Sequence, residues 1–188
     1  MNLANKITMS RLLILPFVII FLYMDNFGRL ISLALFILIM IGDKVDGMVA
    51  RKLGVTSDFG NFFDGLADKV ITSLMFIILL DLKLVPLWAV LLIIARDVST
   101  ESIRSLNMSA GIKPKRSLFS KFKTGMQDIT ILFALWINFS LSSNFTLPYI
   151  HEYNEIILNT LIYVTVFFAY YSLIQVIYSS RKRLLKDS

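Results

Sequence analysis

The 188-residue chain contains no cysteine, and its one histidine is His151. Without cysteine, the chain forms no disulfide and offers neither a thiolate metal ligand nor a cysteine nucleophile. Charged residues make up only 17% of the sequence, while hydrophobic residues make up 56%, more than the roughly 45–50% that is usual in soluble domains. Any chemistry must therefore use carboxylates, hydroxyls and cations in a chain whose composition is typical of a polytopic membrane protein.

Apolar runs, extended to the roughly 20 residues that cross a bilayer, predict six transmembrane helices in one all-α domain, residues 1–188. The predicted spans are 7–24, 29–51, 58–80, 84–105, 123–142 and 155–178. Before the first span we expect a short N-terminal interfacial segment, residues 1–11. Residues 105–122 mix basic and apolar side chains around Gly111 and Pro114 and indicate an interfacial elbow.

Lysine and arginine are unevenly distributed between the connections, which matters more here than the formal charge of +6. The connections after spans one, three and five carry only Arg29 and Lys83, whereas the opposite side of the membrane is rich in cations. By the positive-inside rule, both termini are cytoplasmic. The positive charge thus reflects membrane topology, and we expect no nucleic acid partner.

Residues 43–68 place four aspartates between two apolar segments. At a rise of about 1.5 Å per residue, Asp43 lies about 21 Å below the external end of its helix and Asp68 about 20 Å below the end of the next. The same arithmetic puts Asp46 and Asp64 both at about 26 Å. We therefore predict that Asp43 faces Asp68 and that Asp46 faces Asp64, near the cytoplasmic boundary of the hydrocarbon core.

Helical spacing places each pair of acids on one face of its helix, beside small residues that leave room for a ligand. Four converging carboxylates repel one another unless a cation lies between them, and oxygen-only ligands favour Mg²⁺ or Mn²⁺. Two other interpretations are open from the residues alone. The acids could form structural ion pairs with Lys44, Lys69 or Arg96, or they could line a pathway for cations.

The stretch resembles the signature of the CDP-alcohol phosphotransferase family, D-x2-D-G-x2-A-R-x8-G-x3-D-x3-D. The matching residues are Asp43, Asp46, Gly47, Ala50, Arg51, Gly60, Asp64 and Asp68. This resemblance implies transfer of a phosphatidyl group from CDP-diacylglycerol to an alcohol, with release of CMP. It also implies that the four aspartates hold two metal ions, Mg²⁺ or Mn²⁺, and that Asp68 is the base for the attacking hydroxyl.

The resemblance implies a nucleotide site as well. Gly47, Ala50 and Gly60 would let CDP-diacylglycerol lie close, and Arg51 would assist near its phosphates. The opening segment, with Asn5 and Thr8, resembles that of the bacterial phosphatidylglycerophosphate synthase branch of the family, and we assign both residues to the same lipid nucleotide. Two segments further along share this likeness, ARDVSTESIR and KFKTGMQ.

A phosphorylated acceptor such as glycerol 3-phosphate calls for fixed cations. Arg96 and Arg104 are eight residues apart and lie on roughly one helical face, and Lys121 and Lys123 open the fifth span. We predict that these four cations bind the acceptor phosphate. Three acids near these cations have two open interpretations, as partners of the cations or as polar contacts between helices: Asp97, Glu101 and Asp128.

The sequence thus predicts an enzyme of the bacterial cell membrane with its active site facing the cytoplasm, and the family resemblance suggests a homodimer. Alternative acceptors within the family are inositol phosphate, serine and phosphatidylglycerol. From another class, the alternative is a divalent-cation transporter. Phosphatidyl transfer of the phospholipase D type is excluded, because it needs paired histidines and His151 is alone.

Overall fold

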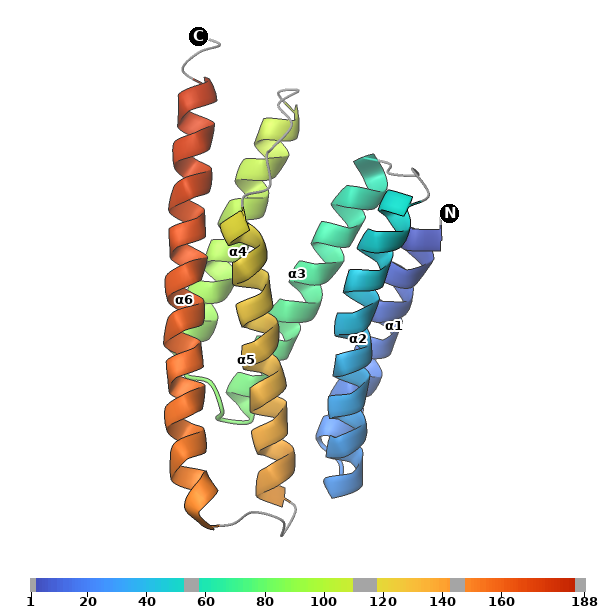
Figure 1. Ribbon diagram of the computed structural model, residues 1–188, viewed down its shortest axis with the longest axis vertical. Helices are drawn as coiled ribbons and strands as arrows, with labels where there is room; N and C mark the ends of the chain where they lie inside the picture. Colours follow the sequence, from blue (N-terminus) through green and yellow to red (C-terminus); the bar gives the residue numbers. More distant parts are fainter. Residues whose placement is uncertain (1–2, 53–57, 110–117, 143–147, 185–188) are drawn as a thin grey trace.

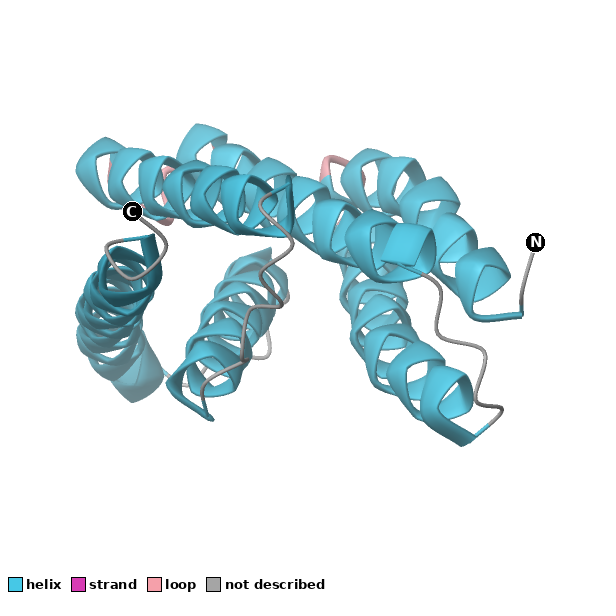
Figure 2. Ribbon diagram, turned by 90° about the horizontal axis from the view of Figure 1, so that it is seen from above, coloured by secondary structure: helices cyan, strands magenta, loops and turns pink. Residues whose placement is uncertain are grey.

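The computed structural model describes residues 3–52, 58–109, 118–142 and 148–184. These residues form helices and short turns, and no strand occurs among them (Figure 2). The helices are α1 (Leu3–Leu22), α2 (Asn26–Lys52), α3 (Asp58–Asp81), α4 (Leu87–Ser109), α5 (Leu118–Ser142) and α6 (Pro148–Leu184). The predicted all-α fold with six helices is confirmed.

The helices run alternately up and down the molecule, so that α1 begins and α6 ends at the same end of the bundle (Figure 1). On one side, α1 packs closely along α2 and also touches α3. On the other side, α6 packs against α4 and α5 (Figure 1). Contacts of α3 with α4 and α5, and of α2 with α5, join the two sides.

Local signals in the sequence explain where several helices begin. Asp25 precedes α2, and its Oδ1 accepts a hydrogen bond of 3.1 Å from the backbone N–H of Gly28, as an N-cap residue does. Pro148 opens α6, where its missing N–H removes no helical hydrogen bond. The turn between α3 and α4 contains Lys83 with a φ of 58° and ends at Pro86. Both turn residues stop one helix and let the next begin.

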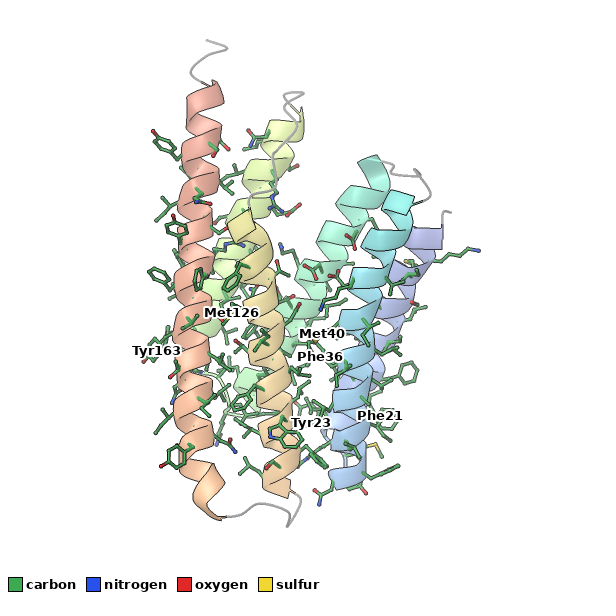
Figure 3. The ribbon with its side chains drawn as sticks, viewed as in Figure 1. Phe21, Tyr23, Phe36, Met40, Met126 and Tyr163 are labelled. Atoms are coloured by element: carbon green, nitrogen blue, oxygen red, sulfur yellow. The ribbon has the colours of Figure 1, made fainter. Side chains whose placement is uncertain are left out.

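The apolar core lies where α1, α2, α3 and α5 meet, with further residues of α4 and α6. Its largest fully buried side chains include Phe36 of α2, Phe76 of α3 and Leu135 of α5. Figure 3 shows Phe36 on the side of α2 that faces the other helices and Tyr163 on the outer side of α6. This core joins α2 and α3 through α1 and α5, which pack against both, and thereby sets the relative level of their acidic residues.

Many large apolar side chains remain on the outside. Leu13, Phe17 and Ile20 form a stripe along α1 in which each side chain is more than half exposed. Within the described residues, one segment qualifies as a helix long and apolar enough to cross a membrane, Tyr153–Ser180 of α6, with a mean hydropathy of 1.8. The number of helices matches the prediction, and the membrane crossing of all six stays a prediction.

The helix bounds differ from the predicted spans mainly at their polar ends. The expected N-terminal interfacial segment is not separate, because α1 is continuous from Leu3. Charged and polar residues extend α6 to Leu184, since a helix does not stop where its apolar run stops. Of the expected elbow at 105–122, residues 105–109 belong to α4 and residues 118–122 to α5, and residues 110–117 lie outside the described part of the chain.

Candidate active site

Three of the four signature aspartates meet at one guanidinium, that of Arg11 on α1. Its Nη2 lies 2.9 Å from Asp43 Oδ1 and 3.6 Å from Asp68 Oδ1, and its Nη1 lies 3.3 Å from Asp64 Oδ1. Arg11 is 3% exposed, whereas the three carboxylates keep 22–34% of their surface. The predicted proximity of Asp43 and Asp68 is confirmed, since one nitrogen contacts both.

The path of Arg11 to the acids depends on a glycine. A Cβ atom on Gly42 would lie 3.2 Å from both Cγ and Cδ of Arg11, closer than ordinary van der Waals contact. Gly42 directly precedes Asp43 on α2, so the arginine stem crosses α2 beside the carboxylate that it pairs with. Thr8, one turn before Arg11 on α1, is 2% exposed. The α1 helix therefore contributes a buried wall to the acidic site.

The acids approach the guanidinium from two helices that the core holds together. Asp43 lies on α2, and Asp64 and Asp68 lie one turn apart on α3, so helical geometry puts both on one face. Thr72, one turn further, donates a hydrogen bond of 2.8 Å to the backbone carbonyl of Asp68. A fifth carboxylate, Asp128 of α5, lies close enough for the charges of Asp43 and Asp68 to act on it.

The donor set of this site suits a hard divalent cation. Its ligands are carboxylate oxygens from two helices, which Mg²⁺ and Mn²⁺ prefer. Within the described residues, no three acids are arranged around one point as a ready-made metal cage. Arg11 occupies the centre between Asp43, Asp64 and Asp68, and the side chain of Asp46 lies outside the described part. The carboxylate oxygens are of the type that binds Mg²⁺ or Mn²⁺, and they form ion pairs with Arg11.

A second charged cluster is buried between α4, α5 and α6. Asp97 accepts hydrogen bonds from Arg96, from the Lys123 ammonium and from the Gln127 amide. The guanidinium of Arg96 also donates to the Ala169 carbonyl and to the Ser172 hydroxyl, at 2.8 Å each. Asp97 is therefore a partner of the cations and also a polar contact between α4 and α5, so both interpretations left open for it apply.

A cavity of about 600 Å³ lies between α3 and α4, beside both clusters. Asp97 lines it, so the buried cluster forms part of its wall. Lys69, next to Asp68, also faces the cavity and forms no hydrogen bond or ion pair within the described part of the chain. Its remaining lining residues are Leu66, Ser73, Val98, Glu101, Ser102, Ser105 and Leu106.

The predicted site residues thus fall into groups. Asp43, Asp64 and Asp68 are brought together, and Gly60 lies one turn before Asp64. Arg104 lies 3.9 Å from Glu101, a loose pair one turn apart. The phosphate-binding roles of Arg96, Arg104 and Lys123 stay predictions. The remaining site residues have side chains outside the described part: Asn5, Asp46, Gly47, Ala50, Arg51 and Lys121.

Two residues of the site were not predicted as such. Arg11 belongs to the opening segment that resembles the bacterial branch of the family and to the cations of the cytoplasmic side, but it was assigned no role in the site, and neither was Gly42. Their spacing offered a signal: Arg11 is one turn after Thr8, and Gly42 adjoins the first aspartate of the signature. The contact between them joins segments 31 residues apart, which no local pattern reveals.

A family model for CDP-alcohol phosphatidyltransferase matches residues 1–173, nearly the whole chain. The chain belongs to this family. The predicted family is thereby confirmed, and the protein is an enzyme of the CDP-alcohol phosphatidyltransferase type.

Curated relatives agree with the family match. The chain is 38% identical to a CDP-diacylglycerol–glycerol-3-phosphate 3-phosphatidyltransferase of Bacillus subtilis (strain 168) over 143 residues, 69% of this chain and 74% of the relative. It is 32% identical to the protein of that name from Rickettsia typhi (strain ATCC VR-144 / Wilmington) over 170 residues, 90% of this chain and 93% of the relative. These alignments span most of both chains.

Proposed function

We propose that the protein transfers the phosphatidyl group of CDP-diacylglycerol to sn-glycerol 3-phosphate, giving phosphatidylglycerophosphate and CMP. The observation that carries this proposal is the contact of Asp43, Asp64 and Asp68 with the same guanidinium, that of Arg11, in a chain whose relatives bear the name of this reaction. Family membership disfavours the transport alternative, for which the same acids would only line a cation pathway.

The reaction joins an alcohol oxygen of glycerol 3-phosphate to the β-phosphorus and breaks the bond to the oxygen of CMP. We propose that Asp68 accepts the proton of the attacking hydroxyl. The contact with Arg11 orients the carboxylate of Asp68, while the hydrogen bond from Thr72 is made to its backbone carbonyl. A general base must lie within hydrogen-bond reach of the proton it removes, so this fixed position is the property that the step requires.

We propose that Asp43, Asp46, Asp64 and Asp68 hold two metal ions, Mg²⁺ or Mn²⁺, which is the number that the family signature implies. When bound, the metal neutralises charge on the pyrophosphate and on the departing CMP. The four carboxylates would hold the metal ions in place, and Gly47, Ala50 and Gly60 would leave space for the nucleotide.

We propose that glycerol 3-phosphate enters through the cavity between α3 and α4. The cavity adjoins Asp68 through its neighbour Lys69, and its volume lies within the range of small-molecule sites. The Lys69 ammonium forms no hydrogen bond or ion pair among the described residues, although its charge acts on Asp68 and Asp97, and serine hydroxyls line the opposite wall. The phosphate of the acceptor would bind at Lys69, and its hydroxyls would face the serines and the carboxylates of Asp97 and Glu101 on α4.

We further propose a multi-pass protein of the bacterial cell membrane, with its site facing the cytoplasm and two copies forming a homodimer. The exposed apolar stripe of α1 and the apolar segment of α6 support membrane insertion. The lipid donor then keeps its acyl chains in the bilayer while the acceptor arrives from water. Light scattering of the detergent-solubilised protein measures the number of copies.

The function is tested with purified protein, CDP-diacylglycerol, Mg²⁺ and a panel of acceptors, by measuring CMP release. We expect release with glycerol 3-phosphate and little with inositol phosphate, serine or phosphatidylglycerol. Release with serine alone would contradict the acceptor but not the chemistry. No release with any acceptor would contradict the transferase proposal as a whole.

A further inference from the structure

The guanidinium of Arg11 lies between the three carboxylates of the acidic site, where a positive charge reduces their mutual repulsion. It is within 3.6 Å of oxygens from Asp43, Asp64 and Asp68, and only 3% of the residue is exposed. Three carboxylates carry three negative charges against one positive charge on the guanidinium. The site therefore keeps an excess of negative charge that still attracts a divalent ion, even with Arg11 in place.

The position of Arg11 is fixed by packing as well as by charge. The Cγ and Cδ atoms of Arg11 lie against Gly42, with Ile7 of the same helix alongside. A buried arginine in such a place cannot swing into water without leaving three carboxylates together. Its guanidinium therefore both aligns the acids and opposes any second cation that approaches the same oxygens.

We propose that Arg11 is a positioning residue that sets the metal affinity of the acidic site. In the metal-free protein it holds the carboxylates of α2 and α3 in register from α1. By its charge it keeps the affinity for a divalent ion low until the pyrophosphate of the donor adds further negative charge. This inference rests on the proposed function, because the same aspartates are taken to hold the metal.

The test measures Mn²⁺ binding to the full chain in detergent, by electron paramagnetic resonance, without either substrate. We expect Arg11→Gln to bind Mn²⁺ at least about tenfold more tightly than the unaltered protein, because one repelling charge is gone. Arg11→Lys retains the charge and should bind Mn²⁺ nearly as the unaltered protein does. In EDTA, Arg11→Gln should unfold at a lower temperature and recover when Mn²⁺ is added.

Gly42→Ala provides a second variant, which keeps the arginine but pushes its stem away from α2. We expect tighter Mn²⁺ binding in this variant too. Gly65→Ala is the matched control, because a Cβ there meets nothing within 4 Å. If Arg11→Gln does not fold, the test is the comparison of Mn²⁺ binding by Gly42→Ala with Mn²⁺ binding by Gly65→Ala.

Unchanged or weaker Mn²⁺ binding in folded Arg11→Gln, or in Gly42→Ala where that variant decides, would overturn the inference. Neither readout uses CDP-diacylglycerol or an acceptor, so such a result would leave the proposed transferase reaction standing. Conversely, normal Mn²⁺ binding without CMP release would contradict the proposed function and leave the role of Arg11 intact.

Discussion

Asp97 of α4 and Lys123 of α5 form an ion pair in which the two side chains are 3% and 1% exposed. Arg96 adds a second cation to the same carboxylate and extends the connection to α6 through Ala169 and Ser172. One buried carboxylate thus holds three helices in a fixed arrangement beside the α3–α4 cavity.

Replacement of Asp97 by alanine should therefore destabilise the protein strongly. Lys123 and Arg96 would stay buried without their shared carboxylate, and an unpaired buried charge typically costs about 3–5 kcal/mol. Thermal unfolding in detergent measures the effect. Glu101→Gln is the control, since its pair with Arg104 is long and partly exposed, and such pairs contribute at most about 1 kcal/mol. Equal losses in the two variants would contradict the structural role of Asp97.

Asp68→Asn should nearly abolish turnover while leaving CDP-diacylglycerol binding largely intact. The amide keeps the shape of the side chain but accepts no proton, and general base catalysis typically contributes about 10²–10⁴-fold in rate. Single-turnover kinetics at saturating substrate, with equilibrium binding of the donor, separate the two effects. Lost binding together with normal chemistry at saturation would show that Asp68 is not the base.

Lys69→Met should raise the KM for glycerol 3-phosphate by roughly 10–100-fold, the equivalent of one charge-assisted hydrogen bond. The KM for CDP-diacylglycerol should change little, because the cavity is assigned to the acceptor. Lys83→Met is the control, since Lys83 is exposed in the turn at the far end of α3. An increase in KM for the donor alone would place Lys69 outside the acceptor site.

Removal of divalent ions with EDTA should stop CMP release, and added Mg²⁺ or Mn²⁺ should restore it. Carboxylates alone would repel the pyrophosphate, so the proposed site cannot hold its donor without added positive charge. Activity assays across a metal titration measure this dependence. Full activity in EDTA after extensive dialysis would contradict the metal-dependent part of the proposal.

The sequence predicted the elements well, because apolar runs long enough to cross a bilayer make six helices with bounds near those observed. It also predicted that Asp43 and Asp68 lie together, since the rise of a helix fixes depth by simple counting. Helix ends were less accurate: α1 starts at Leu3 and α6 reaches Leu184, because polar residues continue a helix without an apolar signal.

Contacts between distant segments were the part that the sequence could not supply. The sequence placed Arg11 in the opening segment of the family resemblance but could not show its contact with the acids, which depends on α1 crossing α2 where Gly42 makes room for it. Arg96 and Lys123 were expected to face a phosphate, and the structure shows both paired with Asp97. The partner of a buried charge depends on how the helices pack together. Neither the periodicity of the sequence nor its charge pattern predicts that packing.

The most direct test of the account follows radiolabelled glycerol 3-phosphate into the lipid phase. Purified protein with CDP-diacylglycerol and Mg²⁺ should convert the label into a chloroform-soluble phospholipid, one CMP being released for each molecule incorporated. Asp68→Asn should incorporate almost none. Label that stays in the aqueous phase with the unaltered protein, while CMP is still released, would contradict glycerol 3-phosphate as the acceptor.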